Sequence, residues 1–138
     1  MYDYSTQGGN WATGVCATGQ GQSPIDINGS ATTVTTKYDQ FELTNWENPH
    51  KWTVKNTGHG VKLVPAVEDM TFTGGDFSEE YTLAQFHFHW GSTMTGGAMT
   101  GGSEHTFDGT QFFSEVHFVH YKSSHADLDA AVASGQQD

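Results

Sequence analysis

The alternation of apolar and polar residues predicts β-strands over most of the chain. Two long segments, 81–90 and 112–121, alternate aromatic or β-branched residues with polar ones, which is typical of strands with two different faces. Two shorter segments, 52–56 and 61–65, are separated by the turn residues 57–60, and this spacing predicts a hairpin. We expect 112–121 to pair with 81–90.

The remaining segments are also predicted to form strands, with one exception. Further strands are predicted at 23–27 and 70–73, and a long, irregular strand region is predicted at 31–46. The exception is 125–134, which has a helical apolar face, with Ser124 as the expected N-cap and Gly135 as the stop. The predicted fold class is therefore mainly β: a central, twisted, mostly antiparallel sheet with few short helices.

Two histidines interrupt the aromatic pattern of segment 81–90. His87 and His89 are two residues apart, so on a strand they project from the same face, about 6.6 to 6.8 Å apart along the backbone. A third candidate, His117, lies in the expected partner strand. Three neutral imidazoles with an open fourth position make a catalytic zinc site. Three aromatic residues face the other way, into a predicted core: Phe86, Phe88 and Trp90.

A histidine on a strand is more often a structural residue than a metal ligand, so the neighbours of each histidine matter. Gln85 stands two residues before His87, on the same face. Glu115 stands in the same relation to His117. Metal-bound imidazoles usually donate their second N–H to such an oxygen, which favours the metal interpretation. His120 faces away from His117, and we interpret it as structural.

Two further histidines are ambiguous. His59, in a Gly-containing turn, is either a plain turn residue or a proton carrier, since the ordinary pKa of histidine suits proton transfer near neutral pH. His105 follows Glu104, and their spacing alone defines no metal geometry. Glu104 is a candidate to orient a hydroxyl group.

Composition narrows the class of partner. The 138 residues include 16 acidic and 5 basic side chains, a formal net charge of −11, which argues against nucleic acid and anionic membranes because phosphate binding needs Lys and Arg. No apolar run approaches the roughly 18 residues of a membrane span, and no signal peptide is visible. The single cysteine, Cys16, is either an unpaired thiol or half of a disulfide whose partner lies outside this chain.

Five motifs together resemble the α-class carbonic anhydrases. They occur in the order of the family and run through nearly the whole chain, so we expect residues 1–138 to form one domain of that type, incomplete at its C-terminus. The motifs are Gln22–Ile27, Asn56–His59, Gln85–Gly91, Gly102–His105 and Glu115–Tyr121. Each motif alone is unspecific, whereas the set is highly specific.

The resemblance implies a zinc enzyme that hydrates carbon dioxide reversibly to bicarbonate and a proton, with zinc-bound hydroxide as the nucleophile. His87, His89 and His117 match the three zinc ligands of the family. Gln85 and Glu115 match the residues that hold the rings of His87 and His117 by hydrogen bonds. Zn²⁺ is thus the expected cofactor.

The same resemblance implies further site residues. His59 matches the proton shuttle at the cavity rim, and Glu104 matches the acid that accepts a hydrogen bond from a hydroxide-orienting threonine. Val119 matches one wall of the CO₂ pocket, and Tyr4 matches a tyrosine that holds the water network. The expected partners are CO₂ and bicarbonate, with no nucleic acid and no membrane, and the sequence defines no oligomeric state.

The chain departs from the family pattern in three ways. The family domain is longer, so we expect a fragment truncated after the first half to two-thirds, with much reduced activity in isolation. Cys16 then matches a cysteine that forms a disulfide in secreted and bacterial members, with a partner in the missing part, which points to a secreted or periplasmic location. Thr57 and Lys62 stand where the family commonly has asparagines, and Lys62 adds a positive charge that attracts anions.

Three other functions compete with catalysis. A carbonic-anhydrase-like binding module without activity typically lacks a zinc-ligand histidine, and all three are present here. A mineral-associated protein would bind calcium through its acidic surface, but the acidic residues are scattered and form no calcium loop. The third alternative is an inactive half-domain that binds zinc.

Overall fold

Strands predominate in the computed structural model, which describes residues 18, 21–38, 40–91, 94–95, 98–99 and 101–135. The prediction of a mainly β fold is confirmed. The predictions for Tyr4 and Cys16 lie outside the described residues. Within the described ranges, no helix is long and apolar enough to cross a lipid bilayer.

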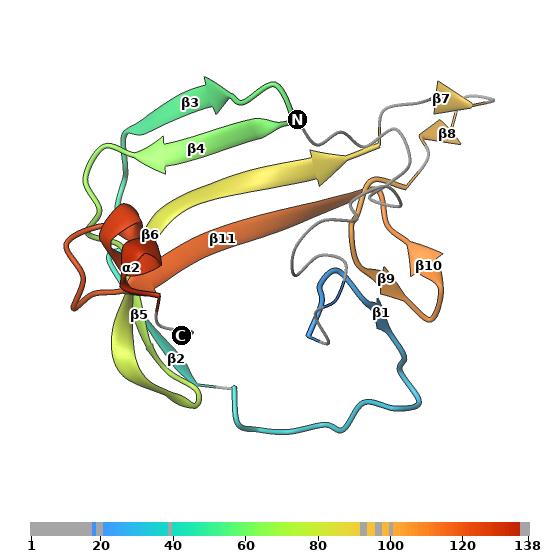
Figure 1. Ribbon diagram of the computed structural model, residues 1–138, viewed down its shortest axis with the longest axis horizontal. Helices are drawn as coiled ribbons and strands as arrows, with labels where there is room; N and C mark the ends of the chain where they lie inside the picture. Colours follow the sequence, from blue (N-terminus) through green and yellow to red (C-terminus); the bar gives the residue numbers. More distant parts are fainter. Residues whose placement is uncertain are drawn as a thin grey trace.

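A six-stranded antiparallel sheet forms the body of the molecule (Figure 1). Its strands are β2 (Phe41–Thr44), β3 (Trp52–Asn56), β4 (Val61–Pro65), β5 (Thr71–Gly74), β6 (Phe77–Trp90) and β11 (Ser114–Lys122). β11 pairs along one edge of β6, while β4 and β5 pair along the other edge. β3 lies beyond β4, and β2 lies beyond β5. The predicted pairing of the two histidine-bearing segments is therefore confirmed.

The described residues also form two smaller sheets. β1 (Asp26–Ile27) runs parallel to β9 (Thr106–Phe107), which pairs with β10 (Thr110–Gln111). β7 (Met94–Thr95) pairs with β8 (Ala98–Met99). The Asp26 carboxylate accepts the Thr106 hydroxyl at 2.6 Å and the Gly109 N–H at 2.9 Å. These bonds lower the pKa of Asp26 and tie together segments that are 80 positions apart.

The ends of α2 (Leu128–Ser134) are set by local hydrogen bonds. The Asp127 carboxylate accepts the Ala130 N–H at 2.8 Å and so caps the first turn. The prediction of Ser124 as the cap was wrong, and the helix starts later than expected. Gly135 ends the helix in the left-handed conformation, as predicted.

One predicted strand region is mostly irregular. Of residues 31–46, only Phe41–Thr44 form a strand, which pairs with β5. Val34 is 99% exposed, and no strand occurs in the described residues between β1 and β2. β-branched composition favours a strand only where a neighbouring strand or core supports it, and these residues have neither.

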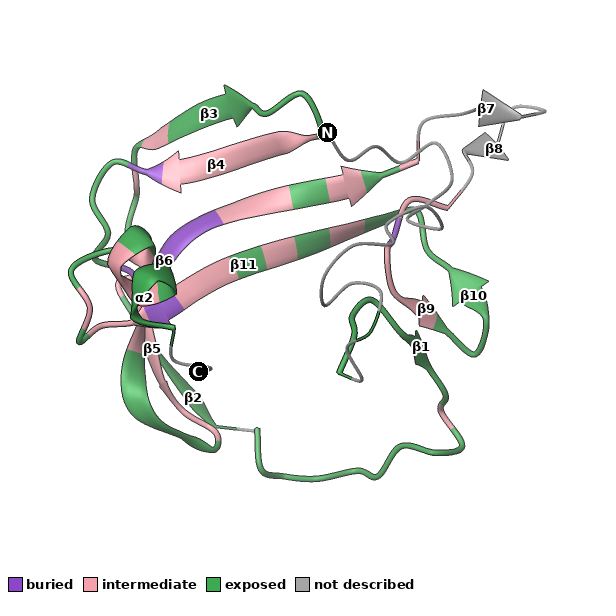
Figure 2. Ribbon diagram, in the orientation of Figure 1, coloured by how far each residue is buried: buried purple, intermediate pink, exposed green. Residues whose placement is uncertain are grey.

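The core lies at one end of the sheet, where α2 packs against β11 (Figure 2). Its buried apolar residues are Met70, Leu83, Ala84 and Tyr121. At the other end of β6 the predicted core is incomplete. Phe86 contacts Phe118, with ring centroids 5.4 Å apart, but Phe88 and Trp90 are 39% and 47% exposed. Their exposure follows because no layer in the described part of the chain covers that face.

Candidate metal centre

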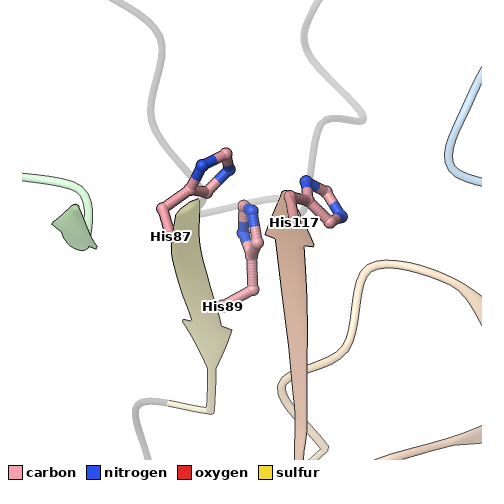
Figure 3. A group of neighbouring side chains, drawn as sticks. All are labelled: His87, His89 and His117. Carbon is pink, nitrogen blue, oxygen red and sulfur yellow. The ribbon is translucent and has the colours of Figure 1, made fainter. Parts of the chain in front are cut away.

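Three histidines from β6 and β11 converge on one face of the sheet (Figure 3). In the antiparallel register His117 lies directly opposite His87. Ring centroids are 5.1 Å apart for His87–His89 and for His87–His117, and 4.6 Å apart for His89–His117. One ligand nitrogen from each ring lies within 4.8 Å of the other two, so the three rings can hold one metal ion.

Hydrogen bonds decide which nitrogen of each ring is free to bind a metal. His87 Nδ1 donates to the amide oxygen of Gln85 at 2.9 Å. His117 Nε2 donates to Glu115 Oε1 at 2.5 Å. A neutral imidazole has one N–H and one lone pair, so the lone pairs remain on Nε2 of His87 and Nδ1 of His117. Gln85 and Glu115 thus each contact the histidine two residues further along the same strand, as the alternation of side chains predicts.

The third ring has a buried polar atom without a protein partner. Nε2 of His89 is buried, and the described residues offer it no hydrogen bond. Its Nδ1 lies 3.4 Å from Glu104 Oε1. Buried polar atoms are rarely unpaired in native proteins, and a bound cation would satisfy this one. Three imidazole nitrogens fit Zn²⁺, which takes three protein ligands and keeps a fourth position open in catalytic sites.

The Glu115 carboxylate organises one side of the centre. Its Oε2 accepts the backbone N–H groups of Glu104 at 3.1 Å and His105 at 2.8 Å. Its Oε1 accepts Nδ1 of His105 at 2.8 Å in addition to the His117 ring. Burial raises the pKa of Glu115, but the hydrogen bonds from His117 and His105 outweigh burial and lower the pKa to about 2. The carboxylate therefore stays ionised and only accepts hydrogen bonds near neutral pH.

Ser23 and His105 belong to this network, although the sequence pattern gave neither a role. The Ser23 hydroxyl donates to Nε2 of His105 at 3.0 Å, because Nδ1 of His105 already donates to Glu115. One feature of the sequence could have indicated this network. Glu115 is a charged residue in an apolar strand, and a buried carboxylate needs more hydrogen-bond donors than a single histidine supplies. His105, Glu115 and His117 also lie close enough for a metal ion, but their facing atoms bond each other.

The surroundings favour the neutral form of His87. Burial lowers the pKa of His87. The neighbouring rings of His89 and His117 and the ammonium of Lys62 lower it further. The carboxylate of Glu104 acts in the opposite direction. Because only the neutral imidazole binds a metal, these effects extend the pH range in which His87 is a competent ligand.

A cavity of about 290 Å³ opens beside the centre and is lined by His59, Lys62, His87 and His89, among others. His59 is exposed, in the turn between β3 and β4. Val119 is half-buried and lies on β11, two residues after His117, where it pairs with Gln85. The structure thus brings His59 and Val119 to the metal side of the sheet.

His120 lies on the opposite face, as expected. Its ring stacks on Trp46 with centroids 6.0 Å apart and meets the edge of Phe72 at 4.9 Å. Burial lowers the pKa of His120, and its bond to the Phe118 carbonyl only partly opposes this effect. The strand pairing is irregular here: Val119 pairs with Gln85 and His120 with Leu83, which leaves Ala84 as a bulge.

Fold and site together define a mainly β protein with a cluster of three histidines that can hold a metal ion. The family model for eukaryotic-type carbonic anhydrases matches residues 6–137. The chain is 36% identical to carbonic anhydrase 4 of Rattus norvegicus over 115 residues, which are 83% of this chain and 35% of that protein. It is also 36% identical to carbonic anhydrase 1 of Oryctolagus cuniculus over 106 residues, which are 76% of this chain and 43% of that protein.

The chain therefore belongs to the α-class, eukaryotic-type carbonic anhydrase family. It spans about two fifths of the length of the curated relatives that it matches.

Proposed function

We propose that this chain forms the zinc centre of a carbonic anhydrase, which converts CO₂ reversibly to bicarbonate and a proton. The observation that carries this proposal is the convergence of one nitrogen each from His87, His89 and His117 within 4.8 Å of one another. Membership of the family supports the reaction. When bound, Zn²⁺ supplies Lewis acidity that activates water toward CO₂.

The residues around the rings hold them in one tautomer. Gln85 accepts the N–H of His87, and Glu115 accepts that of His117. These bonds fix the orientation of each ring and keep the metal-binding nitrogen unprotonated. Because all three proposed ligands are neutral, they leave the positive charge of the ion undiminished.

Four other residues have proposed roles in the reaction. His59, exposed beside the cavity, takes the surplus proton and passes it to buffer. Val119 offers an apolar wall to CO₂ on the face of His117. Glu104 is proposed to accept a hydrogen bond from a hydroxyl group near the metal, and the 3.4 Å distance from its carboxylate to His89 Nδ1 supports this role. Tyr4 is proposed to hold ordered water.

A second candidate function is a zinc-binding module without turnover. The exposure of Phe88 and Trp90 behind the centre favours it, because a catalytic site needs rigid support on both faces of its strands. For either function we propose a secreted or periplasmic location, on the basis of Cys16 alone.

Metal analysis combined with a CO₂-hydration assay tests the proposal. The wild-type chain is compared with His89→Ala and with His125→Ala, a control in the turn before α2. We expect one zinc per wild-type chain and a zinc affinity at least about 100-fold lower in His89→Ala only. Zinc with turnover supports the enzyme, and zinc without turnover supports the module. No zinc binding by the wild-type chain would refute both.

A further inference from the structure

A row of side chains crosses the sheet beside the metal centre. In the antiparallel register Lys55 of β3 lies opposite Lys62 of β4, and Lys62 lies opposite His87 of β6. Directly opposed residues on neighbouring strands project from the same face. Lys62 therefore lies next to a proposed zinc ligand, with Lys55 one strand further away on the same face of the sheet.

These two lysines differ from the paired lysines elsewhere in the chain. Lys37 and Lys122 each form an ion pair with a carboxylate. For Lys55 and Lys62, no carboxylate of the described residues lies within ion-pair distance. Like charges directly opposite each other destabilise a sheet, so this pair attracts a counter-charge from outside the protein.

Lys62 brings its charge into the cavity of the metal centre. It is half-buried and lines the cavity, and its ammonium contributes to the lowered pKa of His87. The other charged groups at the centre are the carboxylates of Glu104 and Glu115. Their two negative charges balance the two positive charges of a zinc ion, which leaves the charge of Lys62 in excess.

We propose that Lys62, assisted by Lys55, binds small monovalent anions in this cavity. Lys55, which is exposed, draws the anion from solvent, and Lys62 holds it with the three N–H donors of its ammonium. The assignment of bicarbonate as the natural ligand rests on the proposed function, whereas the binding of small anions does not depend on it. Lys62 thereby sets both the affinity for bicarbonate and the sensitivity to competing anions.

Anion titrations of the full chain test this proposal, in the zinc-loaded and in the metal-free form. Bicarbonate and thiocyanate binding are followed by calorimetry for the wild type, Lys62→Gln, Lys62→Arg, Lys55→Gln and Lys51→Gln. The last variant is the matched control, because it removes the same charge from an exposed lysine outside the pair. Zinc content and circular dichroism are recorded for each variant.

We expect Lys62→Gln to weaken anion binding about ten-fold and Lys55→Gln about two-fold, with Lys51→Gln near the wild type. Lys62→Arg keeps the charge and retains most of the affinity. Equal affinities of Lys62→Gln and Lys51→Gln would overturn the proposal. A chain that binds anions through Lys62 but hydrates no CO₂ would refute the proposed function alone and leave the anion site supported.

Discussion

At the scale of single residues, one carboxylate connects three parts of the chain. Glu115 bonds the ring of His117 on its own strand and the ring and N–H of His105 next to β9. Through His105 it reaches Ser23, ahead of β1. A fully satisfied polar network of this kind rigidifies its members. The orientation of His117 therefore depends on residues that never contact the proposed metal position.

Replacing Glu115 by glutamine tests this dependence. In Glu115→Gln an NH₂ group takes the place of one acceptor oxygen and opposes the N–H groups that point at it. We expect zinc affinity to fall about 10- to 100-fold, as measured by competition with a chelating dye. Glu42→Gln, at an exposed position of β2, is the control. Equal zinc affinities of the two variants would show that Glu115 does not hold His117.

The strand period predicted the contacts within one strand but not those between distant segments. Gln85 and His87 are two residues apart, so alternation alone relates them, and the same holds for Glu115 and His117. Ser23 and His105 are 82 positions apart and meet only because β1 pairs with β9. No local pattern encodes that pairing, since each of these strands has two residues.

Tyr121 offers a second test at this scale, through its titration. Burial raises its pKa, as does the hydrogen bond that its hydroxyl donates to Glu68 at 2.6 Å, and the pKa reaches about 12 instead of 10.0. The folded state thus retains a proton that the unfolded chain loses. The resulting stabilisation is complete below pH 10 and is lost as the pH rises through 12.

We expect the tyrosine titration followed by ultraviolet absorbance to show one step near pH 12. This step disappears in Tyr121→Phe and remains in Tyr38→Phe, because Tyr38 is a different tyrosine, 49% exposed. The free energy of unfolding of the wild type should also fall more steeply between pH 10 and 12 than that of Tyr121→Phe. A step near pH 12 that persists in Tyr121→Phe would contradict this assignment.

At the scale of elements, the long strands were predictable and the short or unsupported ones were not. β6 and β11 alternate strongly over many residues, so their existence and pairing follow from the pattern. In 31–46 the same β-branched composition gives a strand only where β5 provides a partner. The helix was predicted too long, because both Ser124 and Asp127 have capping side chains and the pattern does not decide between them.

Asp127 and Ser124 make a matched pair for testing the start of α2. Asp127→Ala removes the acceptor of the Ala130 N–H and should lower helix stability by about 1 kcal/mol. Ser124→Ala should change it by less than about 0.5 kcal/mol. Urea unfolding and amide exchange of the helix measure both effects. A larger loss of stability in Ser124→Ala than in Asp127→Ala would show that Ser124 caps the helix, as the sequence pattern predicted.

At the scale of the whole molecule, packing and chemistry occupy different ends of β6 and β11. Burial concentrates near α2 (Figure 2). At the histidine-bearing end the three histidines are half-buried, while Phe88 and Trp90 are exposed. Hydrogen bonds, more than packing, therefore hold the histidines in place. Exposed apolar surface of this kind also favours association with other polypeptide surfaces.

Leu83 tests how much of the stability depends on the packed end. It is 0% exposed and is the only large side chain fully buried in the described part of the chain. Leu83→Ala should lower the free energy of unfolding by about 3 to 5 kcal/mol, while Val132→Ala, at a residue 72% exposed, should lower it by less than about 0.5 kcal/mol. Urea unfolding of the metal-free chain compares them. Similar losses in both variants would contradict a core centred on Leu83.

The bulge at Ala84 lies between these two ends of β6 and changes which face of the sheet the alternating side chains occupy. In a regular strand Leu83 would lie on the same face as His87, because the two residues are four positions apart. The unpaired Ala84 shifts the alternation of side chains by one residue, so Leu83 lies opposite His120, on the other face of the sheet. The bulge thus lets one continuous strand direct Leu83 into the core at one end and the histidines to the opposite face at the other end.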